Sequence, residues 1–144
     1  MATLTDEELF KLIEAARSVQ KHSYSPYSDF SVGAAVLTRS GQVYSGTNVE
    51  TAHYKGICAE ASALSAMISA GERKVRAVTI IAQGDMPAPP CGDCRQRLRE
   101  FSNDETVVYV LNADGSVAKN YTVDELLPDS FGPDHLKSRS TEET

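Results

Sequence analysis

Hydrophobic and polar positions near the start of the chain alternate with the period of a helix. Apolar residues recur every three or four positions over residues 9–19, which places them on one face. Thr5 and Glu8 have the spacing of a capping box, so the helix is expected to begin beside them. It is expected to end near His22, before the turn-rich stretch YSPYSDF.

Further along, apolar runs typical of buried strands alternate with segments typical of helices. The expected strands are SVGAAVL from Ser31, a second piece at residues 42–45 after the turn Arg39-Ser40-Gly41, AVTIIA at 77–82 and VVYVL at 107–111. Helices are expected at residues 57–70, at 92–101, and, in short form, between a Thr122/Glu125 capping box and Pro128. This order predicts parallel strand pairing, with helices covering the sheet.

Length and composition indicate one globular domain. The chain has 144 residues, 41% of them hydrophobic and 24% charged, and we expect a single domain at 1–136 with a frayed tail at 137–144. No apolar run approaches the roughly 20 residues of a membrane span, and the first eight residues are polar and acidic, unlike a secretory signal. The chain is therefore expected to be cytoplasmic, without a membrane partner.

The charge balance bears on the class of partner. A net charge of −6 disfavours binding to polymeric nucleic acid, because a phosphate backbone would be repelled. The basic residues Arg95, Arg97 and Arg99 are expected to be solvated helix surface, since alternate helical positions point in different directions.

Three cysteines carry the candidate chemistry. Cys91 and Cys94 form a Cys-x-x-Cys pair at the start of one predicted helix, and Cys58 lies at the start of another. In a parallel layout both helix N-termini meet at one edge of the sheet, so three thiolates can converge on zinc and leave a fourth position for water. Glu60, two residues after Cys58, interrupts an otherwise apolar helix, and it is placed to carry protons for that water.

The residues alone leave other interpretations open. His53, five residues before Cys58, could close the shell as a fourth ligand and make the zinc purely structural. A zinc-stabilised module that binds a ligand without turnover is a second alternative. A zinc enzyme acting on RNA or DNA is a third, which the acidic charge and the lack of a basic aromatic groove disfavour.

Several motifs together resemble the zinc-dependent cytidine deaminases. The zinc motifs are Cys-Ala-Glu at 58–60 and Pro-Cys-x-x-Cys-Arg-Gln at 90–96. YSPYSDFSVGAAVL at 24–37, GTNVETAHY at 46–54 and ELLPDSFGPDHL at 125–136 resemble further family segments. Three cysteine ligands fit the small, homotetrameric class. The resemblance implies a three-layer α/β/α sandwich around a five-stranded mixed sheet, with active sites at subunit interfaces and one Zn²⁺ per subunit.

The resemblance also implies a reaction and roles for particular residues. Cytidine or deoxycytidine would be hydrolysed to uridine or deoxyuridine, with zinc on the three cysteines and Glu60 moving protons between water, ring nitrogen 3 and the departing amine. The substrate contacts that it implies are Asn48 and Glu50 for the ribose, Phe30 and, from a neighbouring subunit, Phe131 for the ring, and the Ala59 amide and Pro90 carbonyl for the base. Tyr54 is expected beside the substrate, with a core or interface position as its alternative.

One position departs from the family pattern. Members of this class commonly carry arginine after Cys-Ala-Glu, where it bonds to a zinc-bound sulfur, and Ala61 stands there in this chain. Arg95 is expected to supply that donor instead. The change leaves open a tolerance for N4- or ring-modified cytidine analogues, or a preference for another aminopyrimidine nucleoside, as in blasticidin S deaminases.

Overall fold

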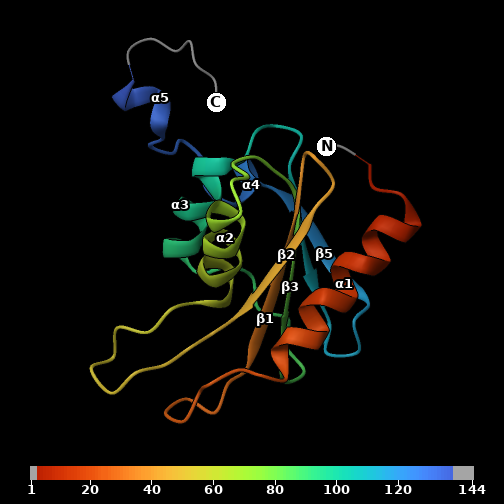
Figure 1. The fold of residues 1–144 in the computed structure, drawn as a ribbon, viewed down its shortest axis with the longest axis vertical. Helices are drawn as coiled ribbons and strands as arrows, with labels where there is room; N and C mark the ends of the chain where they lie inside the picture. The colour runs from red at the N-terminus through yellow and green to blue at the C-terminus, as the bar shows by residue number, and fades with distance from the viewer. Residues whose placement is uncertain (1–2, 138–144) are drawn as a thin grey trace.

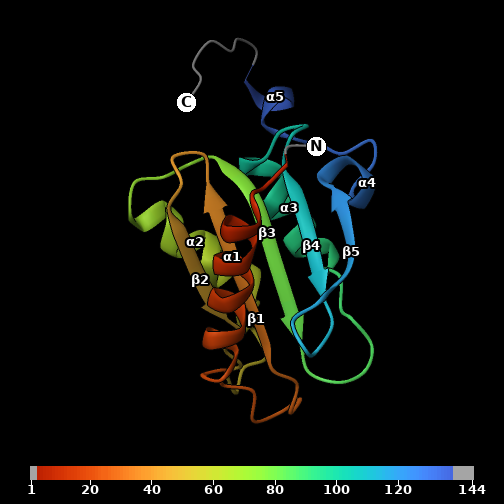
Figure 2. The same cartoon turned by 90° about the vertical axis from the view of Figure 1, so that its right-hand side faces the viewer.

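A five-stranded mixed sheet forms the centre of the molecule. The computed structural model describes residues 3–137, so the predicted fraying at 138–144 lies outside the described residues. The strands are β1 (Val32–Thr38), β2 (Val43–Thr47), β3 (Val75–Ala82), β4 (Val107–Leu111) and β5 (Val117–Thr122). Their order across the sheet is β2-β1-β3-β4-β5, which Figure 2 shows from left to right.

The sheet corrects the expectation of parallel pairing in part. β3 and β4 pair in parallel, as the strand–helix–strand order predicts. β1 pairs antiparallel with β2, as the hairpin predicted from the turn at Arg39-Ser40-Gly41 requires, but it also pairs antiparallel with β3. The helical connection from β2 therefore passes over β1, so that β2 and β3 run in the same direction without being neighbours.

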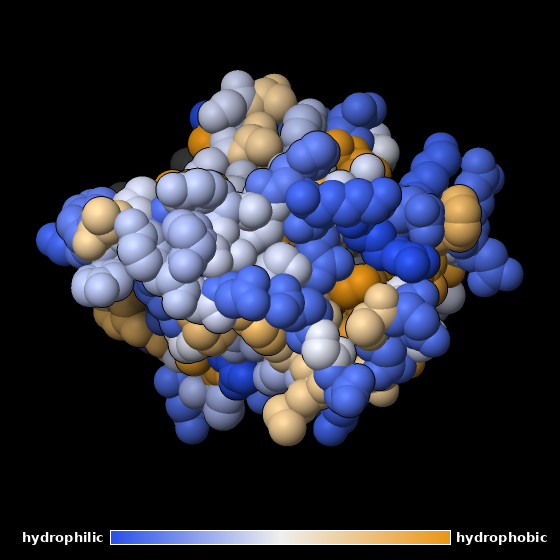
Figure 3. Space-filling view, turned by 90° about the horizontal axis from the view of Figure 1, so that it is seen from below, coloured by the Kyte–Doolittle hydropathy of each residue, from blue (hydrophilic) through white to orange (hydrophobic). Residues whose placement is uncertain are grey.

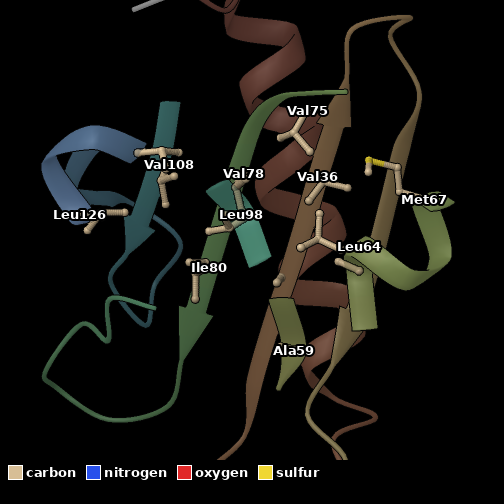
Figure 4. Packing of buried hydrophobic residues seen from close by; sticks show 13 residues of the cluster. Val36, Ala59, Leu64, Met67, Val75, Val78, Ile80, Leu98, Val108 and Leu126 are labelled. Atoms are coloured by element: carbon tan, nitrogen blue, oxygen red, sulfur yellow. The ribbon is translucent and has the colours of Figure 1, made fainter. Parts of the chain in front are cut away.

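Helices cover both faces of the sheet and complete three layers. α1 (Asp6–Gln20) lies on one face, while α2 (Ala59–Ser69), α3 (Gly92–Phe101) and α4 (Val123–Leu126) lie on the other, as the ribbon in Figure 1 shows. The larger core packs α2 and α3 onto the sheet through residues such as Leu64, Met67, Ile80 and Leu98 (Figure 4). The predicted sandwich is thus confirmed.

Local sequence signals account for the helix ends. Thr5 accepts from the Glu8 amide at 3.1 Å and donates its own amide to the Glu8 carboxylate at 2.9 Å, which is the predicted capping box. The same reciprocal pair forms at Thr122 and Glu125 before α4. Gly71 follows the α2 C-cap with φ +93°, a conformation that favours glycine.

Two elements are absent from the sequence predictions. β5 has a mostly exposed edge-strand pattern, without the apolar alternation that marks a half-buried strand. α5 (Pro133–Leu136) is a single turn begun by proline. No helix within residues 3–137 is long and apolar enough to cross a membrane.

Candidate active site

The three cysteines meet at one edge of the sheet, as predicted. Cys58 is the N-cap of α2, Cys91 the N-cap of α3, and Cys94 lies in the first turn of α3. Their sulfur atoms lie within 4.8 Å of one another, and Cys58 Sγ is 4.0 Å from Cys91 Sγ. Tetrahedral zinc with bonds of about 2.3 Å holds its sulfurs roughly 3.8 Å apart, so the trio needs little adjustment to bind it.

The ionised forms of these buried cysteines are unfavourable unless a cation offsets their charge. Burial raises the pKa of Cys94 far above its ordinary value, and the charges of Glu60 and the other two sulfurs raise it further. Burial and the Cys91 charge likewise raise the pKa of Cys58. A divalent metal offsets this cost, and two helix N-termini favour the negative sulfurs. The residues present therefore fit zinc.

His53 lies outside this cluster. The metal-ligating side chains that converge here within the described residues are the three cysteines alone. The Nδ1 of His53 pairs instead with the Thr51 hydroxyl at 2.9 Å, on the surface. A sealed structural shell closed by His53 therefore finds no support in this arrangement.

Glu60 lies in the first turn of α2 with 5% of its surface exposed. Burial raises the pKa of its carboxyl, while its own backbone amide, Cys94 and the charge of Arg97 act in the opposite direction. A buried carboxyl with a raised pKa beside a possible metal site is suited to accepting and returning protons.

Arg95 has a structural set of partners. Its Nε donates to the Pro90 carbonyl at 2.7 Å, and one Nη donates to the Leu126 carbonyl at 2.8 Å. It thereby ties the loop before α3 to the end of α4. These bonds use two of its donors on carbonyls, and its expected bond to a zinc-bound sulfur stays a prediction.

The two backbone groups expected to read the base lie beside the cysteines. Ala59 is the first residue of α2, so its N–H has no acceptor within the helix. The Pro90 carbonyl accepts from Arg95 and keeps a second lone pair. Both groups are therefore available to a ligand next to the metal.

Asn48 is already engaged with the protein. Its Oδ1 accepts from the Ser23 hydroxyl at 2.5 Å and the Val32 amide at 3.0 Å, and its Nδ2 donates to the Phe30 carbonyl at 2.8 Å. One N–H of the amide remains for a ligand. Asn48 thus holds the segment that carries Phe30, just before β1.

The loop 24–31 fixes the carboxylate of Glu50. Its carboxylate accepts from the backbone amides of Tyr27 and Ser28 at 3.0 and 3.1 Å, and from the Ser28 hydroxyl at 2.5 Å. These bonds, led by the Ser28 hydroxyl, lower the pKa of Glu50. The carboxylate lines a groove of about 340 Å³ together with Tyr27 and Tyr54.

The aromatic candidates are exposed. Phe30 is 39%, Phe131 57% and Tyr54 83% exposed. Tyr54 packs edge-on against Tyr27 with ring centroids 5.9 Å apart, so neither is a core residue. Figure 3 shows the molecule from below, and on this face hydrophobic groups are interspersed among hydrophilic ones.

The segment that carries Phe131 is attached to α3. Gln96, two residues after Cys94, donates its Nε2 to the Phe131 carbonyl at 2.8 Å. Arg99 attaches the same segment, because it donates to the Ser130 hydroxyl at 2.7 Å and pairs with Asp134 at 3.3 Å. Arg99 lies eight residues after Cys91, about 12 Å along a helix. α5 lies beyond the C-terminal end of α3 in Figure 1, away from the helix starts.

Some residues that build the site carry no sequence signal of their own. Ser23 and Ser28 orient Asn48 and Glu50. Gln83, just after β3, accepts from the Ser31 amide at 2.7 Å and donates to the Asp29 carbonyl at 2.7 Å. These bonds cross 52 and 54 positions of sequence, so only the folded chain reveals them.

Comparison with known proteins agrees with this geometry. Residues 6–111 match the family described as the cytidine and deoxycytidylate deaminase zinc-binding region. The chain is 39% identical over 127 residues to a cytidine deaminase of Sporosarcina psychrophila, covering 88% of this chain and 93% of that one. It is 43% identical over 122 residues to one of Halalkalibacterium halodurans, covering 83% and 91%.

Solved structures agree as well. The fold superposes on the cytidine deaminase of Burkholderia pseudomallei with a TM-score of 0.80 and 38% identity, covering 89% of this chain and 100% of the other. For the cytidine deaminase of Mycobacterium tuberculosis the TM-score is 0.77 at 32% identity, with 90% and 99% covered. With its converging cysteines and buried glutamate, the chain belongs to the zinc-binding cytidine and deoxycytidylate deaminase family.

Proposed function

We propose that this protein is a zinc-dependent enzyme that hydrolyses cytidine and deoxycytidine to uridine and deoxyuridine, releasing ammonia. The observation that carries the proposal is the convergence of three sulfurs within 4.8 Å beside the buried carboxyl of Glu60. A metal site serving stability alone has no use for a buried carboxyl that costs free energy.

The chain's own groups account for the proton transfers. Cys58, Cys91 and Cys94 would hold zinc, which when bound supplies a Lewis acid that activates water. Glu60 would take a proton from that water as its oxygen adds to ring carbon 4, and would pass the proton to ring nitrogen 3. The carboxylate would then take the second proton from the new hydroxyl on carbon 4 and deliver it to the amino group, so that the carbonyl of uridine forms as the carbon–nitrogen bond breaks and ammonia leaves. Atoms and charges balance, and Glu60 is regenerated.

The nucleoside is proposed to be held from both ends. The Ala59 amide and the Pro90 carbonyl face the base, and Phe30 packs on the ring. Glu50 and the free N–H of Asn48 would bind the ribose hydroxyls, which present donors and acceptors together. Because Glu50 is already oriented by Ser28 and Tyr27, little side-chain ordering remains when the ribose arrives.

We further propose that four copies assemble and complete each other's sites. Within one chain, the segment around Phe131 is attached to α3 by Gln96 and Arg99. Phe131 and Tyr54 are more than half exposed, as expected of side chains that a neighbouring copy covers. Sedimentation analysis of the purified protein tests this, with a tetramer expected and a monomer contradicting it.

Glu60→Gln tests the catalytic proposal. Glutamine keeps the shape of the side chain but cannot carry a proton. Deamination of cytidine, followed by ammonia release, should fall by at least about 10²- to 10⁴-fold. Zinc content should remain one ion per chain, measured by elemental analysis. Turnover near that of the wild type would contradict the role of Glu60.

A substrate panel tests the range of the enzyme. Ala61 has a smaller side chain than the arginine common at this position, and it borders the groove between α2 and α3. We infer a tolerance for N4- or ring-modified cytidines, with cytidine and deoxycytidine still preferred. Turnover of a modified analogue but not of cytidine would favour the alternative of a blasticidin S-like deaminase. Zinc and nucleoside binding without ammonia release would favour a non-catalytic module.

A further inference from the structure

The segment just before β1 lies between the ends of two neighbouring strands. β1 is flanked by β2 on one side and by β3 on the other. Its first residue, Val32, pairs with Ala82, the last residue of β3. One further backbone bond follows, from the Gln83 amide to the Ser31 carbonyl at 3.1 Å. Phe30, the proposed contact to the pyrimidine ring, therefore lies one residue beyond this backbone bond.

The side chain of Gln83 continues the pairing where the main chain turns away. Gly84 has φ +96°, a left-handed conformation that glycine adopts readily and an extended strand does not. Gln83 Oε1 accepts from the Ser31 amide at 2.7 Å and from the Ser31 hydroxyl at 2.8 Å. Gln83 Nε2 donates to the Asp29 carbonyl at 2.7 Å. One side-chain amide thus bonds to the peptide groups on both sides of Phe30.

These bonds have the pattern of a pairing between parallel strands. In such a pairing, the N–H of one residue donates to the carbonyl before its partner residue, and its C=O accepts from the amide after that residue. The Gln83 side chain offers the same donor to Asp29 and the same acceptor to Ser31, with Phe30 in the place of the partner residue. The central strand is thereby prolonged past the end of the backbone sheet.

Phe30 is held from the β2 side as well. Its carbonyl accepts from Asn48 Nδ2 at 2.8 Å, and its amide donates to Ser28 Oγ at 3.1 Å. Asn48 directly follows β2, as Gln83 directly follows β3. The two amide side chains therefore hold the segment from its two edges, and each bonds to groups that the other leaves free.

Hydrogen bonds rather than burial fix the position of Phe30. The Phe30 side chain is 39% exposed, so packing against the core does not determine where the ring lies. Asp29, directly before it, has φ +56°, which is uncommon for a residue other than glycine. The Asp29 carbonyl is the group to which Gln83 donates. The bonds from Gln83 thus stabilise a main-chain conformation that the segment would otherwise adopt less often.

We propose that Gln83 is a positioning residue that holds Phe30 where it packs on the pyrimidine ring of the substrate. This inference rests on the proposed function and adds to it a residue from the end of β3. Water can replace one exposed hydrogen bond, but three bonds from a single side chain share one cost of ordering it. Without them, Phe30 would spend less time in the arrangement that binds, and the apparent affinity would fall in proportion.

The test compares Gln83→Met with Gln20→Met. Methionine keeps the length of the side chain and removes the amide. Gln20 is a matched control, because its Nε2 also donates to Ser31, but to the carbonyl at 3.2 Å, which belongs to the next peptide group along the chain. Gln83→Met should raise KM for cytidine about 5- to 10-fold, the factor for one ordinary hydrogen bond, and change kcat less than about twofold.

Gln20→Met should leave KM within about twofold of the wild type. An equal rise of KM in the two variants would overturn the proposal, because it would assign the effect to Ser31 in general. An unchanged KM in Gln83→Met would overturn it directly.

A double-mutant cycle shows whether Gln83 acts through Phe30. Phe30→Ala removes the ring, so adding Gln83→Met to it should raise KM by no more than about a further twofold. Zinc content should remain one ion per chain in each variant, since Gln83 lies outside the cysteine cluster. Additive effects on KM, or loss of zinc from Gln83→Met, would place the action of Gln83 elsewhere and overturn the proposal.

Amide exchange gives a readout that does not depend on catalysis. The Ser31 N–H is bonded to Gln83 Oε1, so its hydrogen exchange, followed by NMR, should become about 10-fold faster in Gln83→Met and change less than about twofold in Gln20→Met. Unchanged exchange at Ser31 in Gln83→Met would overturn the contact. Wild-type protein with a protected Ser31 amide but no turnover of cytidine would instead overturn the proposed function, so the two failures are distinguishable.

Discussion

The contact between β2 and α2 at Gly46 offers a sharp test of how the fold positions the site. A Cβ at Gly46 would lie 2.5 Å from the Ala63 amide nitrogen and 2.5 Å from Ser62 Cβ. Ordinary contacts between carbon atoms are about 3.5–4.0 Å. Since one of the two neighbours is backbone, rotation of a side chain cannot relieve the clash. Gly46→Ala must therefore move α2 away from the sheet by roughly 1 Å.

That movement has a chemical consequence, because α2 carries Cys58 and Glu60 at its start while the other two sulfurs belong to α3. Zinc sites tolerate distance changes of only about 0.2 Å. We expect weaker zinc binding and a loss of about 10²-fold in kcat/KM, as for a displacement of about 1 Å. Overpacking should also cost about 1–3 kcal/mol of unfolding free energy.

Gly41→Ala is the matched control. Gly41 lies in the turn of the same hairpin with φ +95°, and a Cβ there would meet nothing within 4 Å. The substitution should cost about 1–2 kcal/mol through backbone strain alone. Urea unfolding, zinc content and cytidine turnover are measured for both variants. If Gly46→Ala kept the zinc content and turnover of Gly41→Ala, the close helix–strand contact would not be what positions the catalytic elements.

Three further predictions follow from contacts elsewhere in the chain. Glu50→Gln should raise KM for cytidine by roughly 10-fold or more while changing kcat less, because a charged acceptor already aligned by Ser28 is lost. The hydrogen bond from Thr5 and the interaction with Arg76 lower the pKa of Glu8, so its contribution to stability is present above its ordinary value of 4.5 and is lost as the pH falls through the lowered pKa. Melting curves should accordingly separate wild type from Glu8→Gln at pH 7 and bring them together at strongly acidic pH. Replacing the fully buried Leu98 by alanine should lower the free energy of unfolding, measured in urea, by about 2–5 kcal/mol.

Much of the fold was readable from local signals. The capping boxes at Thr5 and Thr122 mark helix starts because the reciprocal bonds need only residues three positions apart. The position of β1 between β2 and β3 could not be predicted from local signals, because it depends on long-range pairing that periodicity does not encode. β5 went unpredicted because an exposed edge strand needs no apolar face.

The site shows the same division between local and long-range information. The cysteine spacing and Glu60 predicted the metal cluster, because two helix starts at parallel strand ends must converge. The engagement of Asn48 with Ser23 and Phe30 was not predictable, since these partners come from different segments.

Arg95, Arg97 and Arg99 were expected to be solvated helix surface, which holds for the exposed Arg97. Arg95 and Arg99 correct the expectation, because both are half-buried and donate to segments distant in sequence.

Glu60 breaks the apolar pattern of α2, and that break is informative. Burial raises the pKa of the Glu60 carboxyl and of the Cys58 and Cys94 thiols. Ionising these groups without a metal therefore lowers the stability of the fold. A fold keeps such groups together only where a ligand offsets the cost, and zinc does so for the sulfurs. Since zinc prefers the ionised, folded site, its binding must stabilise the fold as well as enable the chemistry. The apolar pattern of α2 is broken at Glu60 because the proposed reaction needs a carboxyl at that position.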